Sequence, residues 1–257
     1  MVDEDRRFSG RSAIVTGASR GIGLAIAQRL AAEGARVLLT ARHEEGLRDA
    51  LAAFPPGSAI AVAGRADDPD HIRDAVDTAA REFGGLDVLI PNAGINPVYG
   101  PLMDLELGSA RKILEVNLLA NLAWVQAAVG HPGLDFRQRR GSVVLISSIG
   151  GQNASPGLGM YGVSKAANAH LARSLAVELA PQIRVNAVAP AVITTRFARS
   201  LYEGREEQVA AGYPLGRLGV PADVAGAVAF LVSEDAGWIS GQVLTIDGGL
   251  MASGGGR

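Results

Sequence analysis

Short runs rich in β-branched residues alternate with longer, alanine-rich segments along the whole chain, and this alternation constrains the fold most strongly. The first three runs, at 12–17, 35–41 and 58–64, are separated by segments with helical spacing of apolar residues. Strands joined by helical crossovers are parallel. Because these runs are almost continuously apolar, both faces of the resulting sheet must be covered by helices.

The alternation continues along the chain and predicts seven strands, the last four at 86–90, 141–147, 183–189 and 242–246. Helices are predicted at 21–33 and 70–83, in a long segment that ends near 129, and in another that ends near 180. The Gly/Pro-rich joints fall between elements rather than between halves. We therefore predict one α/β domain over 1–257, a Rossmann-like, doubly wound parallel sheet, with flexible tails at about 1–7 and 251–257.

Composition excludes several classes of function. None of the 257 residues is cysteine and only four are histidine, so we expect neither disulfides nor a metal site. A formal net charge of -2 provides no basic surface for nucleic acid. There is no uninterrupted apolar run of about 20 residues and no apolar signal segment at the start. We expect a cytoplasmic protein without a membrane partner.

The first predicted strand runs into the segment TGASRGIG at 16–23. In such a strand-to-helix joint Gly17 permits a tight turn, Gly21 lets the backbone approach a pyrophosphate, and Gly23 lets the helix pack closely. The amino end of the helix then faces the anion. This segment predicts a dinucleotide site.

Further motifs accompany the glycine segment: PNAG at 91–94, VNLLA at 116–120, YGVSK at 161–165 and SGQVLTIDGG at 240–249. With them the chain resembles the short-chain dehydrogenase/reductase (SDR) family from about residue 8 to 250. The resemblance implies a nicotinamide cofactor and the catalytic residues Asn117, Ser148, Tyr161 and Lys165. The cofactor contacts that it implies are Gly17, Ser19, Arg20, Gly21, Ile22, Gly23, Arg42, Asn92, Ala93, Gly94, Tyr161, Lys165, Pro190, Ile193 and Thr195.

Tyr161 and Lys165 are four residues apart and therefore share one face of a predicted helix. A tyrosine pKa near 10 is too high for efficient proton exchange at neutral pH, and the ammonium of Lys165 can favour the phenolate. We predict that Tyr161 is the catalytic acid or base. By resemblance, Lys165 also holds the nicotinamide ribose and Asn117 anchors a water in a proton relay. Alternatively, Asn117 satisfies the backbone of a kinked helix.

Two serines follow the predicted strand at 141–147 and compete for the role of oxyanion donor. Ser148 lies thirteen residues upstream of Tyr161, which is the spacing in the family that the chain resembles. We therefore choose Ser148. Ser147 is expected to hydrogen-bond to nearby backbone, as serines at strand ends usually do.

The end of the second strand, Thr40-Ala41-Arg42, predicts a preference for NADP(H) over NAD(H). Folds that bind NAD carry an acidic residue there, which would repel a 2′-phosphate. With alanine at position 41, Arg42 and Arg20 are free to pair with that phosphate.

Three positions depart from the family pattern, and one of them, Pro91 where a second asparagine is common, is tolerable at a strand end. Ala191 stands where the family usually has glycine after the sixth strand, so the local backbone is in question. In the loop at 64–70, either Arg65 or Asp67 falls where the family has an Asp or Asn near the adenine, and the alignment leaves both open.

The segments expected to form the substrate pocket, 94–102, 152–160 and 196–218, are mostly apolar, which favours a hydrophobic ketone or secondary alcohol. The alternative substrate is a 3-oxoacyl thioester on a carrier protein or CoA, since Arg139 and Arg140 resemble part of a carrier-protein site. Pro181 and Gln182 occupy its second basic position. An inactive, cofactor-sensing protein is the least favoured reading. By resemblance we expect a homotetramer, to which the apolar helix at 118–129 contributes.

Overall fold

The computed structural model describes residues 6–254 and contains a seven-stranded sheet in the order β3-β2-β1-β4-β5-β6-β7. All six neighbouring pairs are parallel. The order reverses between β1 and β4, which is where a doubly wound sheet opens a crevice for a ligand. The predicted fold class is confirmed. The strands are β1 (Ser12–Thr16), β2 (Arg36–Ala41), β3 (Ala59–Ala63), β4 (Val88–Ile90), β5 (Ser142–Ile146), β6 (Arg184–Pro190) and β7 (Val243–Ile246).

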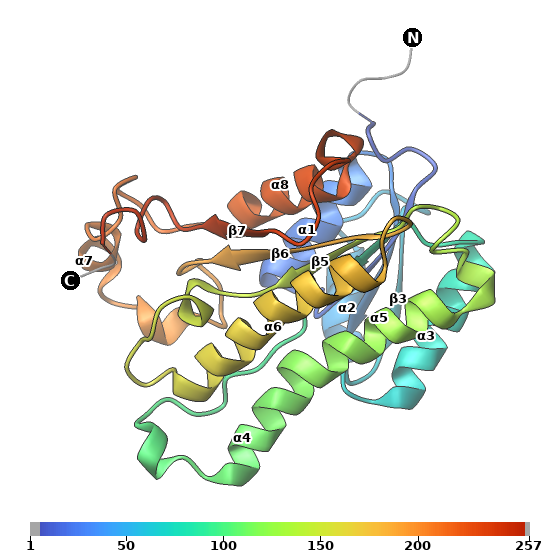
Figure 1. Cartoon of the computed structure of the whole chain (residues 1–257). Helices are drawn as coiled ribbons and strands as arrows, with labels where there is room; N and C mark the ends of the chain where they lie inside the picture. The colour runs from blue at the N-terminus through green and yellow to red at the C-terminus, as the bar shows by residue number, and fades with distance from the viewer. Residues whose placement is uncertain (1–5, 255–257) are drawn as a thin grey trace.

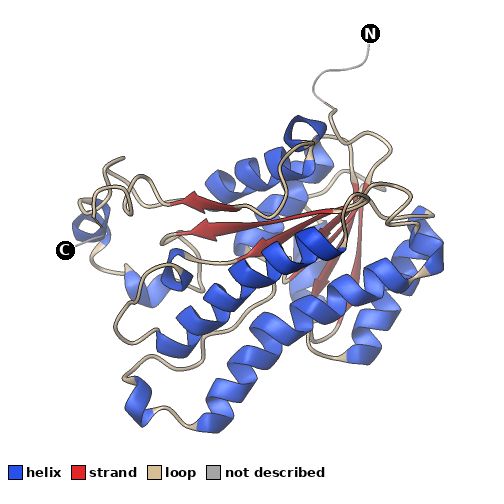
Figure 2. Cartoon of the chain, viewed as in Figure 1, coloured by secondary structure: helices blue, strands red, loops and turns tan. Residues whose placement is uncertain are grey.

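Helices cover both faces of the sheet, and the core is divided into two apolar clusters between sheet and helices (Figures 1 and 2). One cluster includes α1 (Gly21–Ala32), α2 (Glu44–Leu51) and α8 (Pro221–Val232). The other includes α3 (Pro69–Phe83), α5 (Ala120–Gly130) and α6 (Gly159–Glu178). This double cover explains why the strands are apolar on both sides.

The helix predicted to end near 129 is not a continuous α-helix. It consists of α4 (Leu107–Leu114), a π-helical turn at Glu115–Leu119, and α5. The whole stretch Leu107–Gly130 is long and apolar enough to cross a membrane by length and composition. Its residues nevertheless pack against α3 and α6, and Trp124 is fully buried there. We therefore interpret the stretch as part of the protein core.

The segment after β6 contains the short helix α7 (Glu206–Ala210) and 3-10 turns, including one at Arg199–Leu201. Residues 1–5 and 255–257 of the predicted tails lie outside the described residues. In the remainder of the tails, the Arg7 guanidinium pairs with Glu33 at 2.6 Å and the Met251 amide donates to Asp247 at 2.7 Å. These contacts anchor both ends of the described chain.

Candidate active site

The glycine segment forms the turn from β1 into α1, and its geometry requires glycine at specific positions. Gly17 and Gly21 have φ angles of 63° and 61°, in the left-handed region that favours glycine. A Cβ atom on Gly23 would lie 2.6 Å from the Gly17 carbonyl oxygen and 2.4 Å from the Asn92 side-chain nitrogen. The loop is therefore closed upon itself at the amino end of α1.

The ends of β1 and β4 are tied together beside this loop. Asn92 Nδ2 donates to the carbonyl oxygen of Thr16 at 2.7 Å and to that of Gly17 at 3.3 Å. In return, Thr16 Oγ1 accepts from the backbone amides of Asn92 and Ala93 at 3.0 and 2.9 Å. Thr16 was not among the predicted site residues, and only its place at the strand end could have indicated it. These bonds hold the glycine loop in shape for an anion.

Ser148 and Ser147 follow β5 but have different environments. Ser148 lines the cavity described below and its Oγ accepts from the amide of Gly150 at 3.1 Å. Ser147 also borders the cavity but is buried, and its Oγ donates to the carbonyl oxygen of Lys165 at 2.7 Å. The hydroxyl hydrogen of Ser147 is therefore bonded to helix backbone, as expected. This geometry favours Ser148 as the oxyanion donor.

Tyr161 and Lys165 both lie on the first half of α6 and line the cavity. The Lys165 Nζ atom lies 5.6 Å from the centre of the Tyr161 ring and donates to the carbonyl oxygen of Ile146 at 2.7 Å. Burial lowers the pKa of Lys165 to about 8. Burial also raises the pKa of Tyr161 to about 12, although hydrogen bonding with Ser148 opposes this.

The direction of the Tyr161 pKa differs from the sequence-based expectation of a favoured phenolate. Loss of hydration around the tyrosine outweighs the hydrogen bond with Ser148, and the ammonium of Lys165 donates instead to the carbonyl oxygen of Ile146. At neutral pH the tyrosine is therefore protonated. It is ready to donate a proton, which suits the reductive direction of the reaction.

Asn117 lies in the π-helical turn and is fully buried. Its side chain accepts from the amide of Ile95 at 2.7 Å and donates to the Ile95 carbonyl and to Ser164 Oγ. Its own carbonyl oxygen accepts from the side chains of Asn121 and Asn168 at 2.8 and 2.7 Å. The wider turn thus redirects a backbone carbonyl toward polar side chains.

Asn117 does not line the cavity, yet it lies directly behind it. The place that a Cβ atom would take on Gly94 is 3.4 Å from Asn117 Oδ1 and 3.5 Å from Lys165 Nζ. Two polar groups therefore meet behind Gly94. This arrangement accommodates both readings of Asn117, namely the relay with Lys165 and the satisfaction of an irregular helix.

A single cavity of about 840 Å³ extends along the carboxyl ends of the strands. All of the predicted cofactor residues line it, and so do Ser148, Tyr161 and Lys165. The volume is within the range of about 300 to 1,000 Å³ for ligand pockets. The close turn at Gly21 and the adjoining helix terminus fit a dinucleotide pyrophosphate.

At the end of the cavity formed by β2 and β3, Arg42 and Arg20 are exposed and line the wall. Arg65 and Asp67 both line this end as well, and Asp67 pairs with Arg65 at 2.8 Å and with Lys112 of α4. The carboxylate of Asp67 is therefore neutralised by two cationic side chains of the protein. Lys112 was missed by sequence analysis because it comes from a distant helix.

Ala191 needs no glycine-like backbone. Its amide donates to the carbonyl oxygen of Ile246 at 2.9 Å and so extends the pairing of β6 with β7. Among the described residues other than glycine, positive φ angles occur at Asp135 and Arg140. The doubt about this position is thereby removed.

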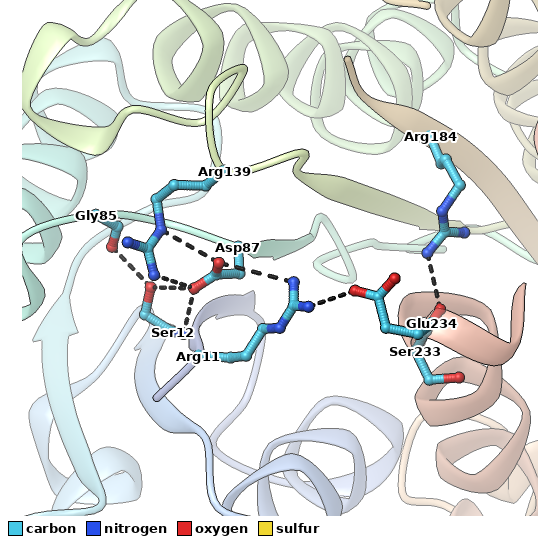
Figure 3. A network of polar contacts seen from close by, with 8 residues as sticks. All are labelled: Arg11, Ser12, Gly85, Asp87, Arg139, Arg184, Ser233 and Glu234. Atoms are coloured by element: carbon cyan, nitrogen blue, oxygen red, sulfur yellow. Dashed lines mark hydrogen bonds and ion pairs between the residues drawn. The ribbon is translucent and has the colours of Figure 1, made fainter. Parts of the chain in front are cut away.

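Arg139 lies at the opposite, amino end of the strands, where Figure 3 shows a polar network. Its guanidinium donates to both carboxylate oxygens of Asp87, at 3.2 and 2.9 Å. Asp87 is buried just before β4 and also accepts from the amide of Ser12 at 2.8 Å. This network connects β1, β4 and the turn before β5, on the edge remote from the cavity.

The doubly wound sheet, the glycine loop and the cavity beside them define the class of this protein as a dinucleotide-binding protein of the Rossmann type. The family profile described as "Enoyl-(Acyl carrier protein) reductase" matches residues 17–251. The chain belongs to the short-chain dehydrogenase/reductase family, as the motifs predicted.

Similar proteins support this assignment over nearly the whole length. "Dehydrogenase/reductase SDR family member 4" of Oryctolagus cuniculus is 40% identical over 250 residues, which covers 94% of each chain. The protein of that name from Homo sapiens is 39% identical over 251 residues, covering 94% of this chain and 88% of the human one. A Brucella melitensis crystal structure titled "Short-chain dehydrogenase/reductase SDR:Glucose/ribitol dehydrogenase" superposes with a TM-score of 0.89 and 31% identity, covering 95% of this chain and 98% of that one.

Proposed function

We propose that the chain interconverts a ketone and a secondary alcohol with NADP(H), using Tyr161 as the acid or base. The observation that carries this proposal is the single cavity, which has Arg20 and Arg42 at one end and Tyr161, Ser148 and Lys165 at the other. When bound, the nicotinamide would supply a hydride to the carbonyl carbon, or accept one from the alcohol carbon in the reverse direction. The protein must then stabilise the negative charge that develops on the carbonyl oxygen and protonate it.

In the reductive direction the Tyr161 hydroxyl donates its proton to the carbonyl oxygen, and Ser148 stabilises the charge that develops there. Lys165 replaces the lost proton through its ammonium and orients the cofactor ribose. Asn117 fixes the Ile95 backbone and Ser164 behind the site and supports the relay. A protein that only senses the cofactor would not need these four groups together, so we favour an active enzyme.

The preference for NADP(H) rests on the charges at the adenosine end. Ala41 offers no carboxylate to the ribose, while Arg20 and Arg42 also line the cavity. Their guanidinium groups suit a 2′-phosphate. Glu45 and Asp49 also line this end, from α2, so the contribution of the arginines must be measured directly.

The test compares NADPH and NADH binding in the wild type, Arg42→Ala and a control, Arg48→Ala. Arg48 lies on α2 outside the cavity lining. Loss of a charge-assisted hydrogen bond should weaken NADPH binding by about 10- to 100-fold in Arg42→Ala and leave NADH binding nearly unchanged. Equal affinity of the wild type for both cofactors, or equal losses in Arg42→Ala, would reject the proposed preference.

A hydrophobic ketone is the proposed substrate, because apolar groups such as Leu158, Val192 and Leu201 line the end of the cavity near Tyr161. The alternative is a 3-oxoacyl thioester. Arg139 is paired with Asp87, and neither residue lines the cavity, which disfavours Arg139 as a carrier-protein contact. Purified protein with NADPH should reduce simple aryl ketones faster than 3-oxoacyl-CoA, carrier-bound 3-oxoacyl thioesters or enoyl-CoA. The opposite ranking would favour the alternative.

We further propose a cytoplasmic homotetramer that requires neither nucleic acid nor a membrane. Apolar side chains remain exposed on the helices and near the last strand, notably Leu119, Val177 and Trp238, which are 50%, 80% and 101% exposed. We propose that these side chains lie in contacts between subunits of a symmetric oligomer. Light scattering at micromolar concentration should give four times the chain mass, whereas a stable monomer would refute the tetramer.

A further inference from the structure

The charges that line the cavity are distributed unevenly. The acidic residues in its lining, Glu45, Asp49 and Asp67, all lie at the adenosine end, in the segments after β2 and β3. In the segments after β4, β5 and β6, no described residue of the lining is acidic. An anion would meet little repulsion from lining residues in this second half, where the ketone is expected.

Arg196 provides a cation in that half. It follows Thr195 in a turn that is closed by hydrogen bonds from the Ala198 amide to the Thr195 carbonyl at 3.2 Å and Thr195 Oγ1 at 3.3 Å. Within residues 6–254, the Arg196 side chain forms no ion pair and no hydrogen bond, although it lines the cavity. Arg199, three residues later, is paired with Glu203.

Aromatic side chains also line this half of the cavity. The ring of Phe197 lies 6.0 Å from that of Tyr161 and is 56% exposed. Tyr99 lines the cavity from the segment after β4 and is 66% exposed. Its ring rests on Gly157, where a Cβ atom would lie 2.6 Å from Tyr99 Cζ. Such exposed aromatic surfaces at a cavity are suited to an apolar ligand group.

From this arrangement we propose that the substrate is an aryl ketone that also carries a carboxylate, with the carboxylate paired to Arg196 and the apolar body against Tyr99 and Phe197. This inference rests on the proposed function, because it names the substrate class of the same site. Guanidinium and carboxylate form paired, charge-assisted hydrogen bonds. The glycine loop already offers Arg20 and the amino end of α1 to the cofactor phosphates, which leaves Arg196 for the substrate.

The experiment uses two ketones with the same acetylphenyl group, para-acetylhydrocinnamate and its methyl ester, with saturating NADPH; the ester removes the negative charge and adds one methyl group. The wild type should reduce the acid with a kcat/KM about two- to fivefold higher than that of the ester, since an exposed ion pair is partly screened by water. In Arg196→Gln this acid-to-ester ratio should fall to about one. The control Arg199→Gln, outside the cavity lining, should retain the wild-type ratio.

Equal kcat/KM values for acid and ester in the wild type would overturn the inference and leave the proposed function standing. The inference would also be overturned if Arg196→Gln lost affinity for NADPH and lost kcat/KM equally for both ketones, because Arg196 would then bind the cofactor phosphates. If the wild type reduces neither ketone, the proposed ketone reduction is refuted for these two compounds. Titration of the enzyme–NADPH complex with hydrocinnamate then decides: binding that Arg196→Gln weakens supports the inference, and its absence refutes it.

Discussion

The pH dependence of cofactor use offers a detailed test of the buried Tyr161–Lys165 pair. Lys165 is 4% exposed, and burial lowers its pKa to about 8. Below pH 8 the ammonium is present, and above pH 8 it is lost. Tyr161, with a pKa raised to about 12, stays protonated throughout this range. A single titration should therefore control the reductive reaction between pH 6 and 10.

The size of the effect follows from that pKa. About nine-tenths of Lys165 is charged at pH 7 and about one-tenth at pH 9, as expected for one group that titrates at pH 8. If only the ammonium form is competent, kcat/KM for NADPH should fall roughly tenfold between pH 7 and 9. The measurement is made with saturating ketone at constant ionic strength, and kcat/KM for NADPH reports on the cofactor-free enzyme.

Lys165→Arg is the matched control, because a guanidinium keeps its charge over the whole range. Its activity is expected to be lower but to vary little up to pH 10. A wild-type profile that stays level to pH 10, or the same decline in Lys165→Arg, would show that the charge of Lys165 does not control the reaction. The reasoning from burial would then be wrong.

Two further predictions concern single side chains. Ser148→Ala should lower kcat by roughly 10²- to 10³-fold through loss of one oxyanion donor, and steady-state kinetics should show a much smaller effect for Ser147→Ala; a larger loss for Ser147→Ala would reverse the assignment. Asp87→Asn should lower the free energy of unfolding by about 2 to 3 kcal/mol, since it breaks a mostly buried pair with Arg139. The control Asp77→Asn should lower it by under about 1 kcal/mol, because the Asp77 side chain is 53% exposed. Urea unfolding measures both, and equal losses would contradict the predicted role of burial.

The sequence was sufficient for the sheet because its pattern is local and repeated. The predicted runs 12–17 and 242–246 correspond to β1 (Ser12–Thr16) and β7 (Val243–Ile246), and differ by one residue at one end. The run at 86–90 is shortened to β4 (Val88–Ile90): the Asp87 backbone still bonds to Ser12 and Ser142, but the Ser12 amide donates to the Asp87 carboxylate in place of a backbone carbonyl. Apolar spacing thus predicts elements well, and side-chain bonds adjust their limits.

Features that depend on contacts between distant segments could not be predicted in the same way. In the π-helical turn, the carbonyl oxygen of Asn117 accepts a hydrogen bond from Asn168 on another helix, and no local sequence pattern predicts that bond. Likewise, Lys112 approaches Asp67 only after α4 has packed beside the loop that follows β3. The protonated state of Tyr161 depends on the burial of its surroundings, which a spacing of four residues does not determine.

The most direct test of the proposed mechanism is a single-turnover reduction by Tyr161→Phe. The enzyme is mixed with bound NADPH and a ketone that the wild type reduces, and NADPH oxidation is followed while fluorescence titration checks cofactor affinity. Loss of the proton donor should slow the reaction by about 10²- to 10⁴-fold and leave NADPH binding nearly unchanged. A rate near that of the wild type, with NADPH still bound, would show that Tyr161 is not the acid.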